Sequence, residues 1–227
     1  MISNRVKNIA PSATLAIDAK AKQIKKEGKD IVIFGAGEPD FNTPENIKKA
    51  AKRAIDENIT RYTPVGGMTK LKEAVVNKFK RDNKIEYDVS EVMISCGGKH
   101  ALYNIAISIL NKGDEAILPV PYWVSFEEMI KLAEAKPVFC KTDDKFKLTA
   151  KDVKKKITNK TKMLILNSPS NPSGAVVEQE EIKKIAKLAV EHDFYVVSDE
   201  VYEFFVYGNN KQISIASLND EIKKLTI

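Results

Sequence analysis

Along residues 91–198, short apolar segments alternate with longer amphipathic segments. Short apolar runs of the kind that form strands inside a sheet lie at 91–95, 115–118, 137–140, 162–167 and 194–198. Between them are amphipathic stretches with the spacing of a helix, at 97–110, 125–133, 149–156 and 178–192. This strict alternation predicts an α/β fold: a three-layer sandwich whose mostly parallel sheet is covered by helices on both faces.

The first third of the chain predicts mainly helices. Residues 12–27 have a helical pattern that begins with a Ser cap and ends at Gly28, and the apolar run 31–34 predicts a short strand. The loop GAGEPDFNTPE is rich in Gly and Pro, and two further helices are expected at 44–57 and 68–82. At the other end, EIKKLTI resembles the end of a helix followed by the start of a strand, so we expect the sequence to stop within an element.

Composition and charge favour an ordinary soluble globular protein. Of the 227 residues, 43% are hydrophobic and 30% charged, which suffices for a sizeable core. The net charge of +6 comes from lysines spread over predicted helices, which favours solvated helix faces over a nucleic-acid surface. No secretion signal or membrane span is expected. Cys96 and Cys140 lack CxxC spacing, which indicates free thiols in a reducing, cytoplasmic setting.

Residues that follow the predicted strands carry the candidate chemistry, because ligands of parallel sheets bind beyond the carboxyl ends of the strands. In CGGKH, two glycines open a helix and expose N–H groups that suit a phosphate. Such a glycine pair is also ordinary turn chemistry, and the motif lacks the GxGxxG and Walker patterns. In PYWVS, Pro119 and Pro121 end a strand and present Trp123, the sole tryptophan, either as a flat face for a planar ring or as a core aromatic.

Two further motifs place an amide and a carboxylate at strand ends. In NSPSNPSG, Asn171 is held extended because it precedes Pro172, and its amide could donate to a ligand oxygen, although SNPSG is more often a plain turn. In FYVVSDEVY, Asp199 follows a buried apolar run, where an acid rarely lies without a partner. Beside an aromatic ligand, its charge would favour a protonated ring nitrogen. Tyr202, on the same face if a helical turn follows, could bond a ring oxygen.

Six motifs in order and spacing resemble the class I and II aminotransferases: GAGEPDFNTPE, RYTPVGG, CGGKHALYN, PYWVS, NSPSNPSG and VVSDEVYE. These are fold type I enzymes that use pyridoxal 5'-phosphate, and within them the chain is most similar to bacterial aspartate aminotransferases. The resemblance covers the whole chain as the N-terminal portion of such an enzyme. It implies an N-terminal arm and part of a small domain at 1–43, and a large cofactor-binding domain at 44–227 that stops before its last strands.

The resemblance implies a role in cofactor binding for several motif residues. Gly98 and Lys99 would give main-chain N–H groups to the phosphate, and Trp123 would stack on the pyridine ring. Asn171 would hydrogen-bond the phenolic oxygen of the ring, with Tyr202 as a second partner.

Three more implied contacts concern the ring nitrogen, the neighbouring subunit and the substrate. Asp199 would pair with the protonated pyridine nitrogen, which makes the ring a deeper electron sink. Tyr62 would reach the phosphate of the other subunit in a homodimer with shared active sites. Gly37 would let the backbone approach the substrate carboxylate, where a Cβ would obstruct. The other implied substrate contacts are Trp123, Asn171 and Lys99.

The chain departs from the family pattern at two places. The family's NPTG reads NPSG here, which keeps a hydroxyl. The lysine that binds the cofactor covalently and the arginine that grips the substrate α-carboxylate follow later in the family, and neither has a counterpart in these 227 residues. We therefore expect a portion of a longer aminotransferase. The alternatives are a truncated, non-catalytic cofactor-binding relative and a generic nucleotide-binding domain that uses CGGK.

Aspartate with 2-oxoglutarate is the substrate pair that the resemblance favours. A lysine at the position of Lys99 helps receive a distal carboxylate in aspartate-type enzymes, and the alternative is a phosphate-loop lysine that faces solvent. Relatives that also accept prephenate tend to carry Lys before PSAT, where this chain has Ala10, which speaks against that activity. Aromatic amino acids and lyase reactions on the same fold are further alternatives. No nucleic-acid, membrane or metal partner is expected.

Overall fold

The computed structural model describes residues 2–33, 35, 37 and 39–227. Its contacts group the chain into two units, and each is described by itself. The small unit comprises residues 10–68, and the large unit comprises the residues up to Ile9 together with Thr69–Ile227. The expected division at residue 43 between a small-domain segment and a cofactor-binding domain concerns function, and it stays a prediction.

Two helices form the regular part of the small unit. α2 (Ala13–Lys26) begins where Ser12 Oγ accepts the Leu15 N–H at 3.3 Å, and it ends before Gly28, whose φ of +81° suits a glycine. α3 (Glu45–Asp56) follows the Gly- and Pro-rich loop. Both helices confirm the sequence pattern.

The strand expected at 31–34 is wrong for residues 31–33, and Phe34 lies outside the described residues. A strand is stable only when a neighbour receives its backbone hydrogen bonds. The described residues of the small unit contain no other strand, so this apolar run has nothing to pair with.

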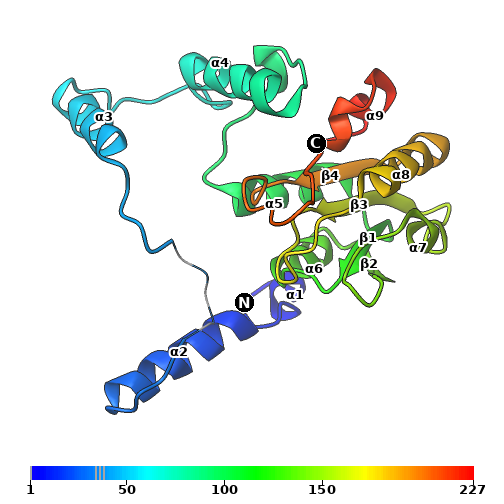
Figure 1. Ribbon diagram of the computed structural model, residues 1–227, viewed down its shortest axis with the longest axis horizontal. Helices are drawn as coiled ribbons and strands as arrows, with labels where there is room; N and C mark the ends of the chain where they lie inside the picture. Colours follow the sequence, from blue (N-terminus) through cyan, green and yellow to red (C-terminus); the bar gives the residue numbers. More distant parts are fainter. Residues whose placement is uncertain (1, 34, 36, 38) are drawn as a thin grey trace. The chain divides into compact units, whose positions relative to one another are not determined.

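Four parallel strands form the centre of the large unit (Figure 1). Their order is β2-β1-β3-β4, with the bounds β1 Glu115–Val120, β2 Lys136–Lys141, β3 Thr161–Asn167 and β4 Tyr195–Asp199. The parallel pairings confirm the sheet type that the alternation predicts. The final residues lie along the other side of β4, where Thr226 bridges Val196 in parallel, as expected from the end of EIKKLTI.

Helices cover both faces of this sheet, which confirms the three-layer α/β sandwich. One face carries α5 (Gly98–Ile109) and α6 (Ser125–Leu132), and the other carries α7 (Ala150–Lys154), α8 (Gln179–His192) and α9 (Asp220–Lys224). Successive strand residues alternate between the two cores because their side chains point to opposite faces. Leu164 packs in the core of α7 and α8, and Ile165 packs in the core of α5 and α6. A ligand therefore reaches the sheet at its edges, where the strands end.

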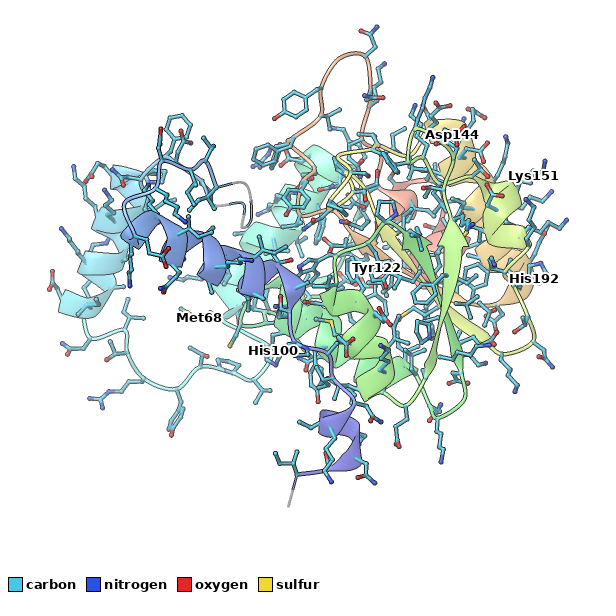
Figure 2. The ribbon with its side chains drawn as sticks, turned by 90° about the horizontal axis from the view of Figure 1, so that it is seen from below. Met68, His100, Tyr122, Asp144, Lys151 and His192 are labelled. Atoms are coloured by element: carbon cyan, nitrogen blue, oxygen red, sulfur yellow. The ribbon has the colours of Figure 1, made fainter. Side chains whose placement is uncertain are left out.

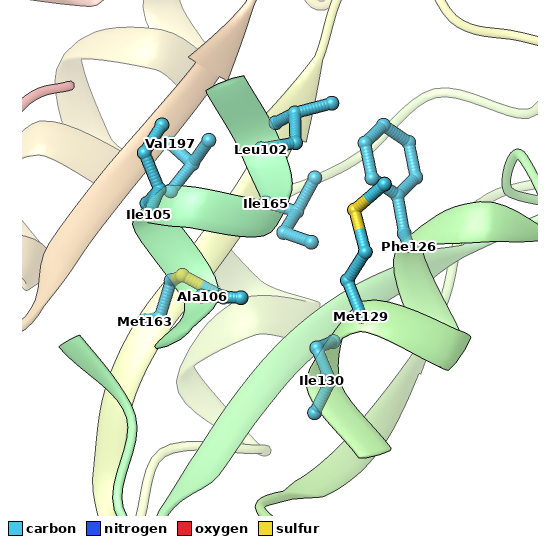
Figure 3. A pocket seen from close by; sticks show the side chains of 9 residues that line it. All are labelled: Leu102, Ile105, Ala106, Phe126, Met129, Ile130, Met163, Ile165 and Val197. Atoms are coloured by element: carbon cyan, nitrogen blue, oxygen red, sulfur yellow. The ribbon is translucent and has the colours of Figure 1, made fainter. Parts of the chain in front are cut away.

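A small cavity lies between α5, α6 and the strands (Figure 3). Its volume is about 10 Å³, and it is lined by apolar side chains: Leu102, Ile105, Ala106, Phe126, Met129, Ile130, Met163, Ile165 and Val197. A void of this size barely holds one water molecule, and its lining offers no polar partner for one. It is a packing defect of the core rather than a ligand site.

Other segments of the large unit differ from the expected pattern. Residues 92–95, expected to belong to a strand at 91–95, follow the 3-10 turn η2 (Val89–Glu91) without pairing to any strand of the described chain, and Met93 is 67% exposed. The helix expected at 68–82 is α4 (Thr69–Lys78) continued by a π-helix, η1 (Phe79–Asn83). Two short elements were not predicted, α1 (Asn4–Lys7) and the 3-10 turn η3 (Ile215–Ser217).

Candidate ligand site at the ends of the strands

The ends of β3 and β4 bring two of the predicted motifs together. Asn167 and Asp199 are partners in the parallel register, and Asn167 Nδ2 donates to the Asp199 carbonyl oxygen at 3.0 Å. The Asn167 Oδ1 accepts the Asn171 N–H at 2.7 Å, and Asn171 Nδ2 donates to Tyr202 Oη at 3.4 Å. Hydrogen bonds thus connect four side chains or their backbones at one edge of the sheet. We call them the strand-end cluster: Asn167, Asn171, Asp199 and Tyr202.

Asp199 is half-buried, and within the described chain no Lys, Arg or His side chain pairs with its carboxylate. One of its oxygens, Oδ1, accepts the Val201 N–H at 3.2 Å. Burial raises the pKa of Asp199 above its ordinary value, and the Val201 N–H opposes part of that rise. A carboxylate in this condition would gain most from a cation with an N–H donor that came from outside the described residues.

Tyr202 reaches the cluster by a different backbone route from the one expected. The chain after β4 forms consecutive turns, in which the Glu203 N–H donates to the Glu200 carbonyl and the Phe205 N–H to the Tyr202 carbonyl. It is not a regular helix, so the shared helix face of Asp199 and Tyr202 is wrong as an explanation. Tyr202 joins the cluster through its contact with Asn171.

The start of α5 offers free backbone donors at the same edge of the sheet. Gly97 has a φ of +87° and turns the chain into the helix. The first N–H groups of a helix have no intrahelical acceptor, and among the described residues those of Gly98 and Lys99 have none elsewhere. A Cβ at Gly98 would meet nothing within 4 Å, so this end of the helix is open to a ligand. Because α5 runs back toward the start of β1, its N-terminus lies on the carboxyl side of the strands.

Trp123 lies beside this helix start. The Lys99 Nζ is 4.9 Å from the centroid of the Trp123 ring, a cation–π contact. Trp123 is half-buried and meets Phe126 edge-on, with centroids 5.4 Å apart. The ring is therefore part core aromatic and part accessible surface. Among the described residues, no hydrogen bond joins Trp123 and Lys99 to the strand-end cluster.

Tyr122, which precedes Trp123, contacts other residues of the fold with both its hydroxyl and its ring. Its hydroxyl donates to Glu127 Oε2 at 2.5 Å, and its ring stacks on Phe139 with centroids 5.6 Å apart. Burial, together with the hydrogen bond to Glu127, raises the pKa of Tyr122 to about 12. The phenol is thus held neutral and is committed to a neighbour within the fold.

Gly37 and Tyr62 belong to the small unit, so the structure does not place them against the strand-end cluster. Tyr62 is 108% exposed, and a Cβ at Gly37 would meet nothing within 4 Å. Their implied roles toward a neighbouring subunit and a substrate stay predictions.

The two histidines lie apart, with His100 in α5 and His192 at the end of α8 (Figure 2). In the described part of the chain, no group of three or more His, Cys, Asp or Glu residues could hold a metal ion. Nor does a helix there have the length and apolar character needed to cross a membrane.

Asn167, the residue that links the motifs, was not predicted as a site residue from the sequence. Its signal was present, because a polar amide directly ends an apolar strand and precedes a Ser-Pro turn. Ser168 was missed as well. It is buried, and its Oγ accepts the Val177 N–H at 3.1 Å and donates to Gln212 Oε1 at 3.2 Å. These contacts hold the loop after β3 in place.

Residues 29–227 match the family model described as aminotransferase class I and II. The chain is 49% identical to an aspartate aminotransferase of Bacillus sp. (strain YM-2), over 100% of this chain and 58% of the relative. It is 47% identical to a probable aspartate/prephenate aminotransferase of Aquifex aeolicus (strain VF5), over 99% of this chain and 58% of the relative. Among solved structures, the aspartate aminotransferase from Thermus thermophilus with maleate has a TM-score of 0.95 and 42% identity, over 100% of this chain and 59% of that one. The chain thus spans less than two thirds of the length of these relatives.

Proposed function

The chain belongs to the class I and II aminotransferases, and from that premise we propose that its strand-end cluster is part of a pyridoxal 5'-phosphate site. The activity we propose for the whole protein is transfer of an amino group between aspartate and 2-oxoglutarate. Family membership removes the generic nucleotide-binding alternative, because one family model accounts for residues 29–227 together.

Asp199 provides the observation that carries this proposal. A half-buried carboxylate with a raised pKa and no cationic partner in the described chain is an unfavourable arrangement by itself. A protonated pyridine nitrogen is a cation and an N–H donor in one group, so it would supply both missing interactions. The donor set around Asp199 therefore fits the ring of this cofactor.

The neighbouring residues suit the other parts of the same molecule. Asn171 and Tyr202, already in contact at 3.4 Å, provide an amide and a hydroxyl for the phenolic oxygen. The N–H groups of Gly98 and Lys99 suit the phosphate at the positive end of α5. The half-buried face of Trp123 suits stacking on the ring.

When bound, pyridoxal phosphate supplies an electron sink for bond cleavage at the α-carbon of an amino acid. The task we propose for Asp199 is to hold the proton on the ring nitrogen, because that charge deepens the sink. The task of Asn171 and Tyr202 is to fix the tilt of the ring through its phenolic oxygen.

Aspartate is favoured as the substrate by the cation at Lys99, which suits a second carboxylate. Several relatives are named aspartate aminotransferases, and the Thermus structure is titled as that of the enzyme with maleate, a dicarboxylic acid. Others are named probable aspartate/prephenate aminotransferases, and Ala10 remains our reason to predict no prephenate activity. A homodimer in which Tyr62 reaches the neighbouring site, a substrate contact at Gly37 and a cytoplasmic location belong to the same proposal.

The test is a panel of amino donors, each assayed with 2-oxoglutarate on the intact protein, combined with a cofactor titration of the same preparation. We expect saturable cofactor binding and the highest kcat/KM with aspartate. Activity confined to aromatic donors would contradict the aspartate assignment. Binding without transfer would favour the non-catalytic relative, and absence of binding would refute the cofactor site.

A further inference from the structure

We propose that Asn167 is a positioning residue of the cofactor site: its side-chain amide sets the direction in which Asn171 offers its own amide to the ring. This inference rests on the proposed function and deepens it. Asn167 was not among the residues predicted from the motifs.

Two opposite bonds of one planar group carry the argument. Asn167 Nδ2 donates to the Asp199 carbonyl at 3.0 Å, and Asn167 Oδ1 accepts the Asn171 N–H at 2.7 Å. The Asp199 carbonyl also accepts the Ser168 N–H at 3.3 Å, so the ends of β3 and β4 are closely tied. The Asn167 amide thus spans from the residue proposed for the ring nitrogen to the residue proposed for the phenolic oxygen.

The chemistry of the position favours asparagine. The group must donate on one side and accept on the other, in one plane and within one short side chain. An aspartate would lack the donor, and an aliphatic residue would lack both. Residues 168–170 connect Asn171 to β3, and the bond from the Asn171 N–H to Asn167 Oδ1 closes them into one turn. Its Nδ2 is then held toward Tyr202.

A purely structural role is the competing explanation, because Asn167 also lines a cavity of about 20 Å³ between the ends of β1 and β3. Thr142 provides a matched control. It lines the same cavity, it is half-buried like Asn167, and its Oγ1 donates to the Val120 carbonyl at 2.7 Å. None of the residues proposed to hold the cofactor bonds to it. Thr142→Val therefore reproduces the loss of a strand-end hydrogen bond without touching the site.

The experiment uses pyridoxamine 5'-phosphate, which has the ring nitrogen, the phenolic oxygen and the phosphate but no aldehyde to react with surface lysines. The dissociation constant and the pH midpoint of the absorbance of the bound ligand are measured on the intact protein, unsubstituted and with Asn167→Ala, Asn171→Ala, both substitutions, or Thr142→Val. We expect Asn167→Ala to weaken binding about tenfold, which is the typical effect of losing one or two hydrogen bonds. The midpoint of the phenolic oxygen should rise, because a donor to its ionised form is lost.

The double variant separates positioning from general loosening. If Asn167 acts through Asn171, the midpoint in the double variant equals that in Asn171→Ala. Additive midpoint shifts, or an Asn167→Ala variant within about twofold of Thr142→Val, would overturn this role while leaving the proposed function intact. Absence of binding by the intact unsubstituted protein would overturn both. If Asn167→Ala loses its native circular dichroism, Asn167→Gln, which displaces the amide by one methylene, is judged by the same criteria.

Discussion

Replacing Asp199 by asparagine should have opposite effects on stability and on cofactor binding. Without cofactor, the carboxylate is half-buried and has the Val201 N–H at 3.2 Å as its partner, with no cation in the described chain. The neutral amide has nearly the same shape and avoids the cost of burying a charge. We therefore expect Asp199→Asn to be more stable than the unsubstituted protein.

The magnitude follows from burial and charge. Relief of a partly buried charge is worth about 1 kcal/mol, which corresponds to a rise in Tm of about 2–4 °C for a chain of this size. The folded protein has a pKa for Asp199 above the ordinary value of 3.8, so it holds the proton more tightly than the unfolded chain. Stability of the unsubstituted protein then falls as the pH rises from 3.8 through the raised value, and the advantage of the variant appears above that window.

Cofactor binding should change in the other direction. A hydrogen bond between charged groups contributes about 1.5–3 kcal/mol, so loss of the carboxylate should weaken pyridoxamine 5'-phosphate binding roughly 10- to 100-fold. Denaturant unfolding over a pH series measures the change in stability. A titration followed by the fluorescence of Trp123, the sole tryptophan of these 227 residues, measures the change in binding.

Asp143→Asn is the matched control for this prediction. Asp143 Oδ1 also accepts the N–H two residues ahead, that of Lys145 at 2.9 Å, and in addition that of Lys147 at 2.7 Å, but the residue is exposed. Its replacement should change neither the free energy of unfolding nor the dissociation constant of pyridoxamine 5'-phosphate appreciably. An Asp199→Asn variant that is less stable than the unsubstituted protein at neutral pH, or that binds the ligand equally well, would refute the reasoning.

Three further predictions concern the fold of the large unit. Glu115→Gln should lower the free energy of unfolding by about 1–2 kcal/mol at neutral pH. The buried carboxylate accepts from Thr158 Oγ1 at 2.7 Å and from Lys136 Nζ at 3.1 Å, and a neutral amide has one acceptor oxygen in place of two. The bond from Thr158 also lowers the pKa of Glu115 from 4.5. In urea unfolding, the difference in stability between the unsubstituted protein and Glu115→Gln should therefore shrink as the pH falls through the lowered pKa. A stability difference that does not depend on pH would contradict this prediction. Burial and the bond to Glu127 raise the pKa of Tyr122 to about 12, so an ultraviolet titration should show one phenol that ionises there and is missing in Tyr122→Phe. Ionisation of Tyr122 near its ordinary pKa of 10.0 would contradict this. Leu164→Ala should cost about 2–5 kcal/mol in denaturant unfolding, because Leu164 is 0% exposed, and a loss under about 1 kcal/mol would be inconsistent with that burial.

The parts of the fold that could be predicted are those that repeat one local pattern of strand and helix. β1, β2, β3 and β4 follow one another through single helices, so a local hydrophobic pattern suffices to indicate them. The runs 31–34 and 91–95 have equally apolar patterns, but a strand also needs a neighbour, and a pattern does not reveal whether one exists. The π-helix Phe79–Asn83 was missed because one wider turn hardly changes the spacing of apolar residues.

The candidate site was predicted in part. Asn171, Asp199 and Tyr202 were each expected just after a strand, and the structure connects them. The connection depends on Asn167, which bonds to Asp199 and Asn171. The bond to Asp199 requires the register between β3 and β4, which cannot be read from the sequence. Trp123 packs against Phe126 and is half-buried, and its role as a stacking face for a ring stays a prediction.

The proposed task of Asp199 is to hold a protonated pyridine ring. The most direct measurement is NMR of pyridoxamine 5'-phosphate labelled with an NMR-active isotope at its ring nitrogen, bound to the protein at a pH where the free ligand is largely unprotonated. We predict a pyridinium chemical shift in the bound state that Asp199→Asn abolishes and Asp143→Asn preserves. A bound ligand with the chemical shift of neutral pyridine would contradict the account.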